Sequence, residues 1–245
     1  MNAFDRYSNY VWEVLDEVRR TQAANIDAAA QLAAKAVAQG GLIHTFGTGH
    51  SHMVAEEVVY RAGGLAAVNA ILEPSLTGNE QVSKSELTER MEGWGKIIVD
   101  YHRIDPKDVM IVISNSGRNA APIEVAWECQ KRGVPVIAIL SRAYGNNLAS
   151  RHSSGKKLMD VADIVIDNCS KLGDATIKLE GLDVPVGPAS NVSAFYIINA
   201  ITVAVVEKLL EMGVKPPVFL SGNLDEGRDY NADLIEKYRG RIAVL

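Results

Sequence analysis

The order of apolar and polar positions divides the chain into a helical N-terminal part and a longer part in which strands and helices alternate. Apolar residues recur at helical spacing over residues 4–22, and an Ala-rich segment over residues 25–39 predicts a second helix. Short apolar runs then predict strands over residues 42–46, 66–72, 108–113, 135–140 and 162–166. Further helices are predicted over residues 51–62, 87–102, 120–132, 191–212 and 229–238.

Alternating strands and helices indicate parallel βαβ units, and strands made of continuous Val, Ile and Leu indicate a sheet that is covered on both faces. The predicted fold class is therefore α/β, a three-layer αβα sandwich around a mostly parallel five-stranded sheet, with an N-terminal helical extension. We expect the extension to occupy residues 1–40, the α/β domain residues 41–215, and a C-terminal tail with a short helix residues 216–245. Residues 73–86 are expected to form a polar loop, and residues 167–188 an irregular segment.

Composition and charge argue against several classes of protein. With 47% hydrophobic and 22% charged residues over 245 positions, the chain is expected to bury a core. A net charge of −5 argues against a nucleic-acid partner, which requires a basic surface. The N-terminus does not resemble a signal peptide, and the most apolar stretch, residues 192–206, is shorter than the roughly 20 residues that span a bilayer. We therefore expect no membrane partner. Two cysteines, Cys129 and Cys169, do not make a disulfide framework, so we expect a cytoplasmic protein with reduced thiols.

Two strand-to-helix turns carry the main indication of function. They read LIHTFGTGHSH over residues 42–52 and VMIVISNSGRN over residues 109–119, each an apolar run followed by small polar residues. In a parallel sheet such turns lie at the carboxyl ends of the strands, where free N–H groups and hydroxyls can hold a phosphate. A third helix N-terminus, near residue 190, is expected to face the same side. The predicted substrate- and phosphate-binding residues are Gly47, Thr48, Gly49, His50, Ser51, Ser114, Asn115, Ser116, Gly117, Arg118, Asn119, Ser190 and Asn191.

The first turn shares part of its sequence with nucleotide-binding motifs. GTGHS at residues 47–51 begins like a dinucleotide fingerprint, but His52 stands beyond it and no third glycine completes the motif. The GK[ST] of a phosphate loop is absent from the sequence. An oxidoreductase is therefore disfavoured, and we expect no cofactor.

GTGHS and SNSGRN, in this order and in this alternating pattern, resemble the two motifs of the sugar isomerase (SIS) domain family. The second motif of that family reads roughly S-x-S-G-x-[ST]. Ser114 and Ser116 match it, while Asn119 replaces its final residue. Ser51 matches the serine of the first turn. The resemblance implies a flavodoxin-like fold and a phosphorylated sugar as ligand.

The resemblance extends over roughly residues 25–210. Phosphoheptose isomerases and N-acetylmuramic acid 6-phosphate etherases are similar subgroups. The segments YRAGG and ILEPSL make the whole chain resemble an uncharacterised bacterial SIS group, the UPF0309 type. The predicted function is a phosphosugar-binding protein that isomerises or otherwise converts its ligand, and the alternative is a non-catalytic phosphosugar sensor. The two N-terminal helices lead us to expect a homodimer or homotetramer.

Both isomerisation and ether cleavage need a side chain that removes a proton next to a carbonyl or masked carbonyl. The predicted catalytic residues are Glu57, Glu73 and His52. Glu57 follows the first turn on a helix that carries a catalytic Glu in phosphoheptose isomerases, and an ion pair with Arg61 is its alternative role. Glu73 directly follows a predicted strand, and His52 lies in the first turn.

A metal site is the alternative for the histidines of the first turn. His50 and His52, with Glu56 one helical turn later, have the composition of a two-His, one-carboxylate site. Such residues more often contact a ligand or cap a helix, so we predict no metal.

Overall fold

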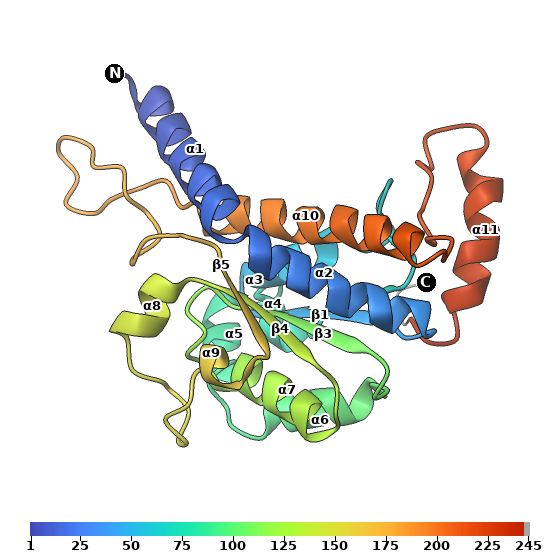
Figure 1. Cartoon of the computed structure of the whole chain (residues 1–245). Helices are drawn as coiled ribbons and strands as arrows, with labels where there is room; N and C mark the ends of the chain where they lie inside the picture. Colours follow the sequence, from blue (N-terminus) through green and yellow to red (C-terminus); the bar gives the residue numbers. More distant parts are fainter. Residues whose placement is uncertain (243–245) are drawn as a thin grey trace.

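The computed structural model of the protein describes residues 1–242, and its centre is a parallel sheet with the strand order β2-β1-β3-β4-β5 (Figure 1). The strands are β1 (Ile43–Gly47), β2 (Val68–Ile71), β3 (Val109–Ile113), β4 (Val136–Leu140) and β5 (Ile164–Asp167). All residues of β1 to β4 are buried, which explains why these segments are mainly apolar runs and do not alternate with polar residues. The prediction of a five-stranded parallel sheet is confirmed.

Helices cover both faces of the sheet (Figure 1). On one face lie α2 (Ala23–Ala38), α3 (Ser51–Glu57) and α10 (Ser190–Glu211), and on the other α6 (Trp94–Tyr101), α7 (Ala120–Lys131) and α9 (Leu158–Val161). Each layer encloses its own cluster of buried apolar side chains, so the sheet separates two cores. The predicted three-layer αβα sandwich is confirmed.

The N-terminal helix α1 (Ala3–Thr21) packs through Tyr10, Val14 and Val18 against the α2–α10 layer. Figure 1 shows α1 extending past the sheet, beside the loop that leads into α10. The C-terminal helix α11 (Gly227–Tyr238) stands at the opposite end of α2 and α10 (Figure 1).

The chain between β2 and β3 differs from the prediction. Residues 73–86 are not a polar loop, because they contain α4 (Pro74–Thr77) and most of α5 (Val82–Thr88). Both helices are too short to show an apolar period in the sequence. The helix predicted over residues 87–102 is interrupted at Gly93, which has φ 88°. A new helix begins after Gly93, and the Glu124 carboxylate accepts hydrogen bonds from the N–H groups of Gly93 (2.6 Å) and Gly95 (2.9 Å) at its start.

Two smaller differences lie near the strand ends. The helix predicted over residues 51–62 ends at Glu57, and the chain turns at Tyr60 with φ 46°. The irregular chain after β4 contains α8 (Arg142–Asn147) and α9, which the apolar pattern did not predict.

The helix α10 has the length and apolarity of a membrane-spanning segment. Eight of its residues are nevertheless buried, and six of them belong to the core shared with α2 and the sheet, among them Ile197, Ile201 and Val205. This is the packing expected of the core helix of a globular domain, and it agrees with the predicted buried helix.

A buried polar network lies at the N-terminal side of the sheet. Asn69 donates to His44 Nδ1 (3.0 Å), so His44 carries its proton on Nε2 and donates it to Asp108 Oδ2 (3.0 Å). Arg241 Nη2 donates to the same oxygen at 2.7 Å. The Asp108 carboxylate also accepts the N–H groups of Leu42 and of its own loop, so it holds the C-terminal segment against β1.

Candidate functional site

The strand order creates a binding position between β1 and β3. β1 leads into α3 on one face and β3 leads into α7 on the other, so the two connections diverge and leave a crevice at the carboxyl ends of the strands. A cavity of about 680 Å³ lies there. It is lined by Thr48, Gly49, His50, Ser51, Met53, Glu89, Ser114, Asn115, Ser116, Asn119, Tyr144, Asp174, Pro188, Ser190, Asn191, Val192 and Phe195. The structure therefore brings the two turns and the start of α10 to one cavity.

The β1 turn is so tight that it leaves no room for a side chain at Gly47. A Cβ added at Gly47 would lie 2.5 Å from the carbonyl oxygen of Ser51, and Gly49 has φ 50°. His52 Nδ1 lies 2.5 Å from the carbonyl oxygen of Gly49, so this ring fastens the turn and does not line the cavity. The side chains left to the cavity include the hydroxyl of Ser51 and the exposed imidazole of His50.

The β3 turn is held from within and keeps one hydroxyl free. The Gly117 N–H donates to Ser114 Oγ (3.2 Å), and Gly117 has φ 59°. Asn115 Oδ1 accepts two hydrogen bonds from the chain that follows β5. Within residues 1–242 the Ser116 hydroxyl has no hydrogen-bond partner, so it is available to a ligand. Gly117 and Arg118 stand outside the lining.

Glu89 is the acidic residue that joins the two turns, and no motif in the sequence indicates it. Thr48 Oγ1 of the β1 turn donates to Glu89 Oε2 (2.7 Å), and Asn119 Nδ2 of the β3 turn donates to Glu89 Oε1 (2.6 Å). Glu89 directly follows α5, so it reaches the cavity only because residues 74–88 fold into two short helices. Its carboxylate is fixed, half-buried and part of the cavity wall.

The start of α10 already holds an anion of the protein itself. The N–H groups of Ala189 (3.1 Å) and Ser190 (2.9 Å) donate to Asp174 Oδ1, and the Ser190 hydroxyl donates to Asp174 Oδ2 (2.6 Å). Asp174 has φ 63°, a left-handed conformation that Asp tolerates better than most residues. Asn191 Nδ2 donates to the carbonyl oxygen of His50 (3.0 Å). Ser190 and Asn191 line the cavity as predicted, but this helix end is occupied by the Asp174 carboxylate.

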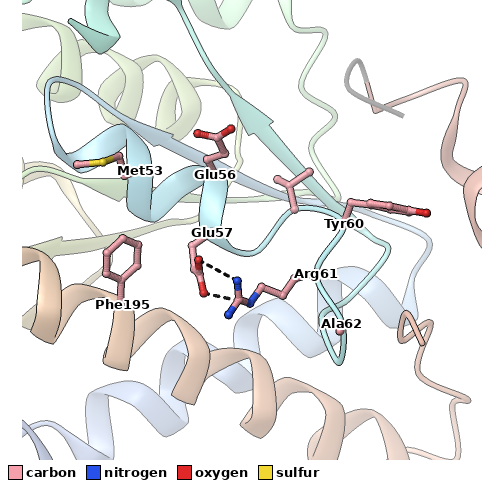
Figure 2. A pocket seen from close by; sticks show the side chains of 8 residues that line it. Met53, Glu56, Glu57, Tyr60, Arg61, Ala62 and Phe195 are labelled. Carbon is pink, nitrogen blue, oxygen red and sulfur yellow. Dashed lines mark hydrogen bonds and ion pairs between the residues drawn. The ribbon is translucent and has the colours of Figure 1, made fainter. Parts of the chain in front are cut away.

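Glu57 lies in a second depression, beside the cavity. Figure 2 shows its carboxylate turned toward Arg61, and the two side chains form an ion pair of 3.1 Å. This depression has a volume of about 550 Å³ and lies between α3 and α10. Met53 and Phe195 line both hollows, and Glu57 lines only the second.

Glu73 and the residues of the alternative metal site do not meet at the cavity either. Glu73 Oε1 lies 3.6 Å from His102 Nε2, and Glu73 is not among the lining residues. Glu56 lines the same depression as Glu57. Over residues 1–242 no group of three His, Cys, Asp or Glu side chains is placed to hold a metal ion, and this includes His50, His52 and Glu56.

The comparison with protein families agrees with this geometry. A family model for the SIS domain matches residues 6–141. The chain belongs to the SIS domain family. It is 44% identical over 243 residues to a UPF0309 protein of Thermoanaerobacter pseudethanolicus, with 98% of each chain covered. A UPF0309 protein of Caldanaerobacter subterraneus is 42% identical, over 98% of this chain and 99% of the relative.

Solved structures share the SIS fold at low sequence identity. A phosphoheptose isomerase of Neisseria gonorrhoeae superposes with a TM-score of 0.58 at 17% identity, covering 83% of this chain and 97% of that one. The Vibrio vulnificus NanR protein complexed with ManNAc-6P gives 0.55 at 16% identity, covering 99% and 70%. The sugar isomerase domain of an RpiR transcription factor from Sphaerobacter thermophilus gives 0.53 at 14% identity, covering 98% and 99%. One SIS fold thus occurs in an isomerase and in a transcription factor.

Proposed function

We propose that this SIS protein binds a phosphorylated sugar in the cavity between β1 and β3 and converts it by proton transfer, with Glu89 as the general base. The observation that carries the proposal is the pair of hydrogen bonds from Thr48 and Asn119 to the Glu89 carboxylate. These bonds tie the carboxylate to both turns at once. Any ligand held by the turns is therefore held next to a fixed carboxylate.

The phosphate is assigned to the hydroxyls and main-chain groups of the two turns. Ser51, Ser114 and Ser116 line the cavity, and the free Ser116 hydroxyl supports this assignment. The α7 N-terminus, which follows Asn119, adds the favourable end of a twelve-residue helix dipole. The start of α10 is less suited to a phosphate, because the Asp174 carboxylate already accepts its N–H groups.

The chemistry follows from a carboxylate beside a sugar carbonyl. Glu89 removes the proton from the carbon next to the carbonyl, and the electron pair of that C–H bond forms an enediolate. Return of the proton to the neighbouring carbon, with transfer of a proton between the two oxygens, completes an aldose–ketose isomerisation. Glu89 is preferred over Glu57 and Glu73 because it lines the cavity.

A non-catalytic phosphosugar sensor is the second candidate. It is supported by the RpiR transcription factor and by the NanR structure with ManNAc-6P, which both share this fold. A sensor would bind the same ligands in the same cavity without breaking the C–H bond.

Deuterium exchange separates the two candidates. The protein is incubated in D₂O with a set of aldose and ketose monophosphates, and NMR follows loss of the proton next to the carbonyl. Calorimetry measures binding of the same compounds. For an enzyme, we expect exchange in wild type and a loss of about 100-fold or more in Glu89→Gln, which removes the base and keeps its shape. Ser116→Ala is expected to weaken binding about tenfold through loss of a hydrogen bond to a charged group.

Glu57→Gln is the matched control, since it removes a carboxylate that lies outside the cavity. Binding without exchange would identify a sensor. Exchange that survives in Glu89→Gln and stops in Glu57→Gln would move the base to α3. Absence of binding by every sugar phosphate tested would contradict the proposal as a whole.

The same proposal covers location and assembly. We place the protein in the cytoplasm, and its two cysteines, both buried and free, suit a reducing compartment. We propose a homodimer or homotetramer without nucleic-acid or membrane partners. Exposed aromatic residues on α1, Phe4 (77%) and Trp12 (68%), support contact with a second copy.

A further inference from the structure

Three arginines from separate segments come together beside Glu89. Arg90 is the next residue after Glu89, and Arg118 directly precedes Asn119. Arg151 comes from the chain between α8 and α9. Its main-chain N–H donates to the carbonyl oxygen of Arg118 (2.8 Å), and its Nη1 donates to Asn119 Oδ1 (3.0 Å). The arginines thus stand next to the two residues that form the Glu89 wall of the cavity.

The charges of this arginine cluster are only partly compensated by the protein. Arg90 forms an ion pair with Glu86. Within residues 1–242, neither Arg118 nor Arg151 forms an ion pair with a carboxylate. In the same part of the chain, the Nε atoms of Arg90 and Arg118 are buried and lack a hydrogen-bond partner. A buried N–H donor without a partner lowers the stability of the protein, so a bound acceptor at these two Nε atoms would be favourable.

The guanidinium groups lie close enough to repel one another. The pKa of Arg151 is lowered, first by desolvation and then by the charges of Arg90 and Arg118. Glu89 and Glu86 act on it in the opposite direction, and less strongly. Positive charges gathered in this way are stabilised when an anion binds among them, and guanidinium forks suit the paired oxygens of a carboxylate or phosphate.

We propose that Arg90, Arg118 and Arg151 form a second anion subsite beside Glu89, so that the ligand is a phosphosugar carrying a second negatively charged group. This inference rests on the proposed phosphosugar site and narrows its substrate class. The phosphate occupies the two turns, and the second anionic group, a carboxylate or a second phosphate, lies past Asn119 among the arginines. The sugar carbon between the two charged groups is then the one that faces Glu89.

Paired ligands that differ in one charged group test the subsite. Calorimetry compares fructose 6-phosphate with fructose 1,6-bisphosphate, and glucose 6-phosphate with 6-phosphogluconate. Wild type is expected to bind at least one doubly charged member at least tenfold more tightly than its partner. In Arg151→Gln that preference should fall below threefold, mainly through loss of affinity for the doubly charged ligand. Arg228→Gln, which removes an exposed arginine on α11, is the charge-matched control and should keep the wild-type preference.

The two proposals fail in different ways in this experiment. Equal affinity for both members of each pair in wild type would overturn the second subsite and leave the phosphosugar site standing. An equal loss for both members in Arg151→Gln would assign this arginine to support of Asn119 alone and would also overturn the subsite. If no sugar phosphate binds while wild type is folded, the proposed function itself is refuted, and the subsite with it. The carboxylate and bisphosphate arms show which second group is accepted.

Discussion

Replacing Asp108 by Asn tests the buried polar network that joins β1, β3 and the C-terminal segment. The Asp108 residue is 1% exposed, and its carboxylate accepts hydrogen bonds from His44 (3.0 Å) and Arg241 (2.7 Å). Burial raises the pKa of this carboxyl, but the hydrogen bonds that it accepts lower the pKa more, so it falls from 3.8 to about 2. At about 1.36 kcal/mol for each pH unit, the ionised form contributes about 2 kcal/mol to the free energy of unfolding.

The variant should lose somewhat more than this amount at neutral pH. Asn keeps the shape of the side chain, but it leaves Arg241 without its counter-ion and replaces one of the two acceptor oxygens by an N–H₂ donor, which faces the N–H groups that this oxygen accepted. Loss of one partner of a buried pair costs about 3 kcal/mol or more. For a chain of this length, about 2–4 °C of melting temperature corresponds to each kcal/mol, so Tm should fall by about 6–12 °C at pH 7.

The pH dependence carries the sharper test. Because the folded-state pKa lies below the unfolded value, the stabilisation is complete above about pH 4 and is lost as pH falls toward about 2. The Tm difference between wild type and Asp108→Asn should therefore narrow as pH falls from 7 to 3, because about half of this stabilisation is lost by pH 3. Asp16→Asn removes an exposed carboxylate that is paired with Arg19, and it should change Tm much less. A Tm difference below about 2 °C at pH 7, or one that stays constant down to pH 3, would refute this account of the network.

Two further predictions concern the β1 turn and the outer surface. Gly47→Ala should destabilise the protein by about 1–3 kcal/mol and abolish sugar-phosphate binding, because the added Cβ would lie 2.5 Å from the carbonyl oxygen of Ser51. Gly222→Ala is the control, since a Cβ there meets open space. Equal Tm values for the two variants would contradict the crowding argument. Trp12→Glu should shift the protein toward monomer in size-exclusion chromatography with light scattering, because Trp12 is 68% exposed on α1; a wild-type protein that is already monomeric would remove the basis for a contact through α1.

The apolar pattern was sufficient for the sheet and for the two turns. β3 and β4 are uninterrupted runs of Val, Ile, Leu, Met and Ala, and such runs identify strands that are covered on both faces. Glycine and serine after β1 and β3 indicated a binding edge, and the strand order places both turns at one cavity. The strand order also confirms the flavodoxin-like arrangement that the SIS resemblance implied.

The pattern could not find the residues that arrive by long-range folding. Glu89 has no local motif around it, and its contacts with Thr48 and Asn119 join positions 41 and 30 residues away. Asp174 lies in a segment without periodicity, and its role at the start of α10 depends on a left-handed backbone that sequence does not reveal. For Glu57, the resemblance to phosphoheptose isomerases suggested a catalytic position, whereas the structure pairs it with Arg61 in the neighbouring depression.

The packing of α2 against α10 bears on how the chain is made. These two helices lie side by side in one layer, although α10 begins more than 150 positions after α2 ends (Figure 1). During synthesis the Ala-rich face of α2 therefore leaves the ribosome long before its partner exists. At translation speeds of about 5–20 residues per second this interval lasts on the order of ten seconds, so the face of α2 that packs on α10 stays without that partner until the last third of the chain is made.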